Sequence, residues 1–319
     1  MCLAMPDLVH DRINDSGISL PPGTVFRKLK KFTPDGRLTW EQKLLPDLAR
    51  EVGANLLHSL TGSLPLTTPL PCVISPAAFD AGPGGSLLTR IVAALGHGGS
   101  SLARALFWPE GLPEPAEDAP VLRLPNTIHS AFSSGNSTSA DAASEPYIFC
   151  PGPVRGDALE YLAAVWGKIC AGLGEDWALA VDGISNADAQ AIRQQSGSTA
   201  QVWPALSHSP TDRARLMQNA AVVLCAGTPS PWGDPMLQAL ACGRPVAAEE
   251  NEWNALRAGP AAYLTPPGDA RLLGAAALTL AVEESVAEAL AEAALVRAQT
   301  LRSESFPDRL LQAYWKILS

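Results

Sequence analysis

Val222-Val-Leu-Cys-Ala-Gly-Thr-Pro-Ser-Pro-Trp-Gly-Asp-Pro-Met-Leu-Gln-Ala-Leu-Ala-Cys-Gly-Arg-Pro-Val-Ala-Ala248 is the stretch that decides the fold. Its apolar run from Ala220 to Cys225 is typical of a strand that is covered on both faces. A loop rich in glycine and proline follows, and Pro235 stands where a first helical turn tolerates proline. Gly243 suits the position just past the helix end, before a second strand. Such a unit places backbone N–H groups where phosphates commonly bind, although a βαβ crossover without a ligand has the same pattern.

This stretch resembles the donor-binding signature of the family 4 glycosyltransferases, which are retaining enzymes of the GT-B architecture. The family pattern runs Ser-x-x-Glu-Gly-Phe-Gly-x-Pro-x-x-Glu-Ala-x-Ala-x-Gly-x-Pro-Val, and residues 232–235 and 239–246 fit it. Ser230 and Gln238 stand in place of the two glutamates. The resemblance implies that the first of these positions approaches the transferred sugar and that the second bonds the ribose hydroxyls of the nucleotide.

The residues at these positions change the expected chemistry. Gln238 still offers a ribose a neutral acceptor and donor, whereas Ser230 can bond a sugar hydroxyl but carries no charge. Asp234 has two interpretations: it replaces the missing charge, or it caps the helix that starts beside Pro235. We favour the cap.

The loop after the strand expected at 147–151 is the second part of the donor site that the resemblance implies. The family supplies an arginine and a lysine there; this chain has Gly152-Pro-Val-Arg155-Gly-Asp157. Asp157 falls where the lysine would be, and at 4 Å a like charge costs on the order of 4 kcal/mol at an effective dielectric of 20. Arg155 is the substitute cation. The donor-binding candidates are therefore Gly152, Arg155, Ser230, Trp232, Gly233, Asp234 and Gln238, and no residue is assigned as catalytic.

The first half of the chain resembles the family more loosely. A helix is expected at 39–50, a buried strand at 53–60, a strand at 72–75, and two helical pieces between residues 87 and 111. His58 matches a family histidine and is the acceptor-side candidate, but the histidine that ends the later strand in many members is absent at Ser75-Pro76. Thr24–Leu29 is a candidate strand. No strand with a glycine-rich loop is evident before Trp40, so we expect a shortened N-terminal domain.

The second half alternates strands and helices. Strands are expected at 147–151, 177–181, 200–203 and 261–264, and helices at 157–171, 186–195 and 209–219, the last two capped by Asn186 and by Ser209 or Thr211. This alternation predicts a doubly wound parallel sheet without help from the family. The serine- and alanine-rich segment 133–145 is typical of a linker. We therefore expect an α/β, GT-B-like fold of two Rossmann-like domains, 1–135 and 146–319, facing a cleft.

Composition and charge limit the classes of partner, cofactor and location that we expect for this protein. The chain has 319 residues and a net charge of −9, which argues against nucleic acid as a partner. No cysteine or histidine spacing suits a metal, and no cofactor is expected. The chain begins without a signal-peptide pattern and has no apolar run of about 20 residues, so a cytoplasmic location is expected. We interpret the basic cluster at residues 27–31 as a solvated charged face; the alternative is contact with anionic lipid, which would be peripheral at most.

Two functions are the main alternatives from the sequence, and a third is an α/β binding protein that is unrelated in activity. The first is a glycosyltransferase that uses a nucleotide-sugar donor, such as a UDP- or GDP-hexose, and an unknown acceptor. The second is a catalytically inactive GT-B-fold protein that acts as a partner or regulator of another glycosyltransferase. The weakened positions at residues 76, 157, 230 and 238 favour the second interpretation, while the preserved glycines and prolines of the signature favour the first.

Overall fold

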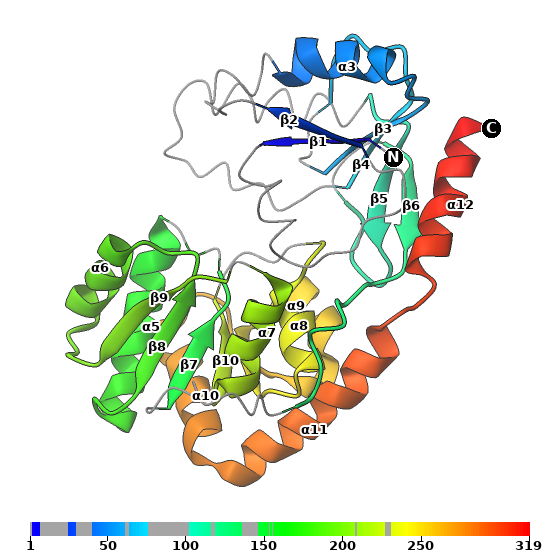
Figure 1. Cartoon of the computed structure of the whole chain (residues 1–319). Coiled ribbons are helices and arrows are strands. Elements are labelled where there is room, and N and C mark those ends of the chain that lie inside the picture. The colour runs from blue at the N-terminus through cyan, green and yellow to red at the C-terminus, as the bar shows by residue number, and fades with distance from the viewer. Residues whose placement is uncertain are drawn as a thin grey trace. The chain divides into compact units, whose positions relative to one another are not determined.

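The computed structural model describes residues 2–6, 25–29, 40–60, 64–75, 102–115, 119–135, 146–152, 154, 156–207, 209–226 and 231–319. The chain forms two compact units (Figure 1). The first comprises Met1–Glu110, Glu114–Asn126 and Glu304–Ser319, and the second comprises Gly111–Pro113 and Thr127–Ser303. This grouping differs from the expected domains 1–135 and 146–319, because the C-terminal segment joins the first unit and residues 127–135 join the second.

The first unit is built on a parallel sheet with the order β3-β4-β5-β6. Its strands are β3 (Leu57–Ser59), β4 (Cys72–Ile74), β5 (Ala105–Pro109) and β6 (Val121–Leu124). The helical piece expected just before Gly111 is wrong, because this segment is the interior strand β5 and all five of its residues are buried. A short buried apolar run cannot be assigned to strand or helix by periodicity. The strand at 53–60 is shorter than expected and only half-buried, since β3 lies at an edge of the sheet.

Helices and a second, smaller sheet complete this unit. A π-helical turn, Trp40–Leu44, leads into α3 (Leu45–Glu51), and α12 (Phe306–Leu318) contacts β6. The expected strand near Thr24–Leu29 is confirmed as β2 (Val25–Leu29), which pairs in parallel with β1 (Cys2–Pro6). β1 was not expected from the sequence, and the segment that follows it, where a glycine-rich loop would lie, is outside the described residues. Five residues that end in proline carry too little alternation to identify β1 from sequence. The helix expected at 87–95 lies outside the described residues.

The second unit confirms the doubly wound parallel sheet. Its described strands follow the order β12-β11-β10-β7-β8-β9, all parallel. They are β7 (Tyr147–Cys150), β8 (Ala178–Asp182), β9 (Gln201–Ala205), β10 (Val222–Cys225), β11 (Val246–Glu249) and β12 (Tyr263–Thr265). Read from β9, this is the dinucleotide-fold order 3-2-1-4-5-6, and the order in which successive strands are added reverses between β7 and β10.

Helices cover both faces of this sheet (Figure 1). One hydrophobic cluster joins the sheet to α5 (Asp157–Leu173), α6 (Asn186–Ser196) and α10 (Ala270–Val282). The other joins it to α7 (Pro210–Asn219), α8 (Pro235–Ala241), α9 (Glu252–Ala258) and α11 (Glu284–Leu301). Burial on both faces explains why the strands have continuous apolar sequences instead of alternating ones.

Helix ends fix the loops at both edges of the sheet. The backbone N–H of Asp212 donates to Ser209 Oγ, which confirms Ser209 as the cap of α7. The cap of α6 is Ser185 rather than the expected Asn186, because Ser185 and Asp188 form a reciprocal capping box. Gly243 has φ +66° directly after the last turn of α8, as its expected position requires.

Candidate functional site

The sequence candidates in the second unit follow two neighbouring strands. Gly152 and Arg155 come after β7, while Ser230, Trp232, Gly233, Asp234 and Gln238 come after β10. These two strands flank the position where the strand order reverses. Ligands of open α/β sheets bind at such positions, outside the carboxyl ends of the strands. Arg155 and Ser230 lie outside the described residues.

Gly152 is required by a close approach of two backbones. A Cβ atom at this position would lie 2.1 Å from the backbone oxygen of Asp182, at the end of β8. The loop after β7 therefore passes against the neighbouring strand without room for a side chain. Asp157 is the first residue of α5, and no side chain caps that helix at Gly156.

Asp234 has the capping role that we favoured. Its Oδ1 accepts from the Met236 N–H at 2.9 Å, and its Oδ2 lies 3.1 Å from Arg257 Nε. Both side chains are at most 8% exposed. Burial raises the pKa of Asp234, and the Arg257 guanidinium opposes that shift. Arg257 Nη2 also donates to the Pro231 carbonyl at 3.2 Å, so the buried pair holds the loop ahead of α8 in place.

The neighbours of Asp234 have distinct geometries. Gly233 is exposed and has φ +67°, a conformation that glycine adopts without strain. Trp232 is half-buried. Gln238 Nε2 donates to the Gly233 carbonyl at 3.3 Å, whereas Gln238 Oε1 is buried and has no hydrogen-bond partner among the described residues.

Gln238 lines a pocket of about 260 Å³ that sequence reasoning did not assemble. The other lining residues come from the segment after β9, from the start of α7 and from the segment 127–133. They are His129, Phe132, Ser207, Ser209, Pro210 and Arg213. The volume is slightly below the range of about 300–1,000 Å³ of complete small-molecule sites, so it suits one part of a larger ligand.

The cation of this pocket is held by a buried carboxylate. Arg213 Nη2 lies 2.6 Å from Asp182 Oδ2, and the Asp182 side chain is 4% exposed. Asp182 also accepts from the Ser207 hydroxyl at 2.6 Å and from the Ser207 N–H at 3.1 Å. Arginine has five N–H donors, so this network leaves donors of Arg213 for a ligand. The signal in the sequence was an aspartate at the end of the apolar strand β8 and two serines, Ser207 and Ser209, after the next strand, β9.

The segment 127–133 forms a wall of the pocket because side chains of the second unit hold its backbone. Gln218 Nε2 donates to the Ser133 carbonyl at 2.9 Å, and Arg302 Nη2 donates to the Phe132 carbonyl at 2.8 Å. His129 Nδ1 accepts from the Ala131 N–H at 3.2 Å, which places the hydrogen of a neutral imidazole on Nε2. His129 therefore offers the pocket a donor.

His58, the acceptor-side candidate, belongs to the first unit. Its Nδ1 lies 2.6 Å from Tyr314 Oη on α12, and its Nε2 lies 2.8 Å from Ser75 Oγ just past β4. Burial lowers the pKa of His58 to about 4, so the ring is neutral at pH 7. Ser75, which lies near the position of the absent family histidine, is thus hydrogen-bonded to His58. The acceptor role stays a prediction.

Two absences hold for the described part of the chain. No group of three or more His, Cys, Asp or Glu side chains in it is placed to hold a metal ion. None of its helices combines the length and the apolar character needed to cross a bilayer.

Comparison with known proteins identifies the fold. No family model and no curated protein sequence matches the chain. Solved structures do, at low identity. Sucrose-phosphate synthase from Thermosynechococcus elongatus aligns with a TM-score of 0.71 at 15% identity, over 94% of this chain and 85% of that one. WaaG, a glycosyltransferase involved in lipopolysaccharide biosynthesis, aligns with a TM-score of 0.68 at 15% identity, over 97% of both chains.

A third similar structure contains ligands. HepE from Anabaena, solved in complex with UDP and glucose, aligns with a TM-score of 0.63 at 14% identity, over 93% of this chain and 86% of that one. The two parallel-sheet α/β units and these similarities together show that the chain has a GT-B-like fold.

Proposed function

We propose that this protein is a retaining glycosyltransferase that transfers a hexose from a nucleotide-sugar donor, such as a UDP- or GDP-hexose, to an acceptor hydroxyl. In this reaction the bond between the anomeric carbon and the diphosphate oxygen breaks, and a bond to the acceptor oxygen forms. The acceptor proton is released, and the nucleoside diphosphate leaves. The nucleotide sugar is a substrate, and no resident cofactor is part of the proposal.

The observation that carries the proposal is the Gln238 side chain, which lines the pocket and whose buried Oε1 has no hydrogen-bond partner within the described part of the chain. Leaving a buried acceptor without a hydrogen bond costs about 1–3 kcal/mol, so a bound hydroxyl at this atom would be stabilising. The sequence resemblance implies that the residue at this position hydrogen-bonds the ribose hydroxyls of the nucleotide. The pocket around Gln238 adds the two serine hydroxyls, the His129 Nε2 donor and the Arg213 guanidinium. These groups suit the hydroxyls and amide-like edges of a nucleoside.

The departing diphosphate needs positive charge or backbone N–H groups to stabilise it. In the proposal Arg155 supplies that charge, because it follows β7, and Gly152 lets the same loop approach β8 closely. The fold gives indirect support, since HepE, which shares it, was solved with UDP and glucose.

The test is calorimetric titration of the protein with UDP and with GDP, followed by an assay of donor hydrolysis. Gln238→Leu keeps the side-chain volume but removes the amide, and it should weaken nucleotide binding about fivefold, the effect of one hydrogen bond worth about 1 kcal/mol. Gln195→Leu is the matched control, because Gln195 is exposed on α6 and lines neither this pocket nor any other described here.

The outcomes separate the functions. Failure of both nucleotides to bind at millimolar concentration would refute the proposal. Nucleotide binding that Gln238→Leu weakens, without hydrolysis of any donor, would instead identify a nucleotide-binding relative that does not catalyse transfer.

A further inference from the structure

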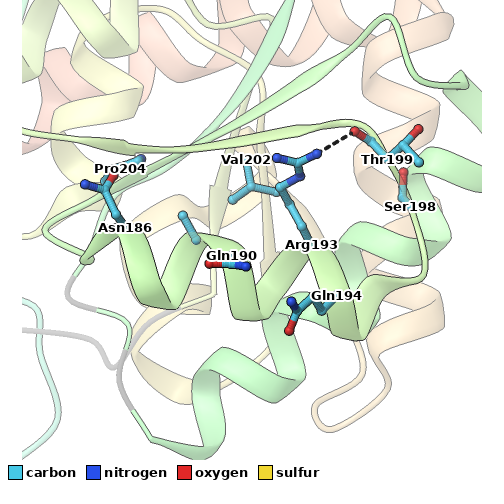
Figure 2. A pocket seen from close by; sticks show the side chains of 9 residues that line it. Asn186, Gln190, Arg193, Gln194, Ser198, Thr199, Val202 and Pro204 are labelled. Atoms are coloured by element: carbon cyan, nitrogen blue, oxygen red, sulfur yellow. Dashed lines mark hydrogen bonds between the residues drawn. The ribbon is translucent and has the colours of Figure 1, made fainter.

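A second, larger pocket lies on the second unit, between α6 and the outer strand β9. Its volume is about 490 Å³, within the range of about 300–1,000 Å³ of small-molecule sites. Figure 2 shows the side chains that line it: Asn186, Ala189, Gln190, Arg193, Gln194, Ser198, Thr199, Val202 and Pro204. We call it the α6–β9 groove. It shares no residue with the Gln238 pocket.

Helix α6 provides one wall of the groove through a polar face. Asn186, Gln190 and Gln194 follow one another at intervals of four residues, so they lie on the same side of the helix. All three are exposed, and among the described residues none of their amide groups has a hydrogen-bond partner. Three carboxamides, each able both to donate and to accept, therefore line one wall of the groove.

The opposite wall and the floor differ in character. Ala189 and Val202 are at most 8% exposed and form an apolar base together with Pro204 of β9. Arg193 Nη2 donates to the Thr199 carbonyl at 3.3 Å, which holds the guanidinium across the groove (Figure 2). It is the one charged side chain among the lining residues, and no carboxylate accompanies it.

From this arrangement we infer that the α6–β9 groove is a saccharide-binding site. Each sugar hydroxyl is both a donor and an acceptor, and a carboxamide is an uncharged side chain that can bond to it in both ways. The C–H face of a pyranose ring can pack against the apolar base formed by Val202 and Pro204. Arg193 adds hydrogen-bond donors for ring or hydroxyl oxygens.

An extended peptide fits the groove less well. A peptide that joins the sheet as an added strand must exchange backbone hydrogen bonds with the edge strand. Pro204 lies within β9 and has no N–H, and proline on an edge strand acts against such pairing. The side-chain amides of α6 thus remain the recognition elements, which favours a hydroxyl-rich ligand.

The experiment is binding of the labelled full-length protein to a printed array of neutral and uronate-containing glycans, in saturating UDP. UDP is included so that binding in the nucleotide pocket does not contribute to the signal. The variants are the double substitution Gln190→Leu with Gln194→Leu, and the control Gln195→Leu on the same helix. All three positions are exposed, so the fold should be unaffected, which circular dichroism checks.

We expect the wild type and the control to bind a common set of glycans, and the double variant to bind them at least tenfold more weakly. Absence of any glycan signal, or an equal signal from the double variant, would overturn the inference. The inference does not rest on the proposed function, because loss of UDP binding would refute the transferase and leave the array result intact.

Discussion

The pH dependence of stability tests the buried position of His58. Burial lowers the pKa of His58 to about 4 from its usual 6.5. Between these values the unfolded chain binds a proton at His58 and the folded chain does not. Protonation of His58 therefore leaves the free energy of unfolding unchanged above pH 6.5. As the pH falls from 6.5 toward 4, proton binding to the unfolded chain lowers the free energy of unfolding. Linkage gives a loss of about 2 kcal/mol between about pH 7 and pH 5.

The assay is urea denaturation at these two pH values, followed by circular dichroism, for the wild type, His58→Asn and Tyr314→Phe. Tyr314→Phe removes the hydrogen bond to His58 Nδ1 and identifies which transition belongs to the first unit. It should keep the pH dependence, because burial is the cause of the shift. In His58→Asn the loss should be smaller by about 2 kcal/mol. An equal loss in His58→Asn and wild type would show that His58 is not buried as described.

Three further predictions concern the second unit. Gly152→Ala should prevent stable folding, because its Cβ would meet a backbone oxygen at 2.1 Å, whereas Gly135→Ala has nothing within 4 Å and should leave the melting temperature unchanged. Asp234→Asn keeps a capping side chain but leaves Arg257 buried without a charge partner, so thermal or urea unfolding should show a loss of about 3–5 kcal/mol. If the loss is below about 1 kcal/mol, the buried ion pair is not formed. Arg155→Ala should weaken UDP binding in calorimetry, and an unchanged affinity would exclude Arg155 as the cation for the diphosphate.

The sheet of the second unit was predictable because its strands and helices have different periods. The run at 147–151 and the helix expected at 157–171 correspond closely to β7 and α5, since apolar runs and helical spacing are local properties of the sequence. The first unit was harder. In β5 the apolar residues are consecutive, and the local pattern suits a buried helix equally well. Only pairing with β4 and β6, which are distant in sequence, decides between the two.

The candidate site was predictable only in part, and for a similar reason. Gln238 and Asp234 belong to a contiguous motif, so a pattern could find them. Arg213 is held at the pocket by Asp182, which is 31 residues away in the sequence. His129 comes from a segment that precedes β7, whereas the other lining residues that carry polar groups follow β7. No local pattern reports such contacts. The cap at Asp234 was correctly expected because proline at the next position marks a helix start.

The attachment of residues 127–133 to the second unit determines where the chain can be divided for study. A fragment that begins after the serine-rich linker, at residue 146, would lack Phe132, which is 2% exposed within the core. Gln218 and Arg302 would lose their backbone acceptors in such a fragment. A fragment that begins at Thr127 and ends at Ser303 retains all three, so we expect it to be the more soluble of the two.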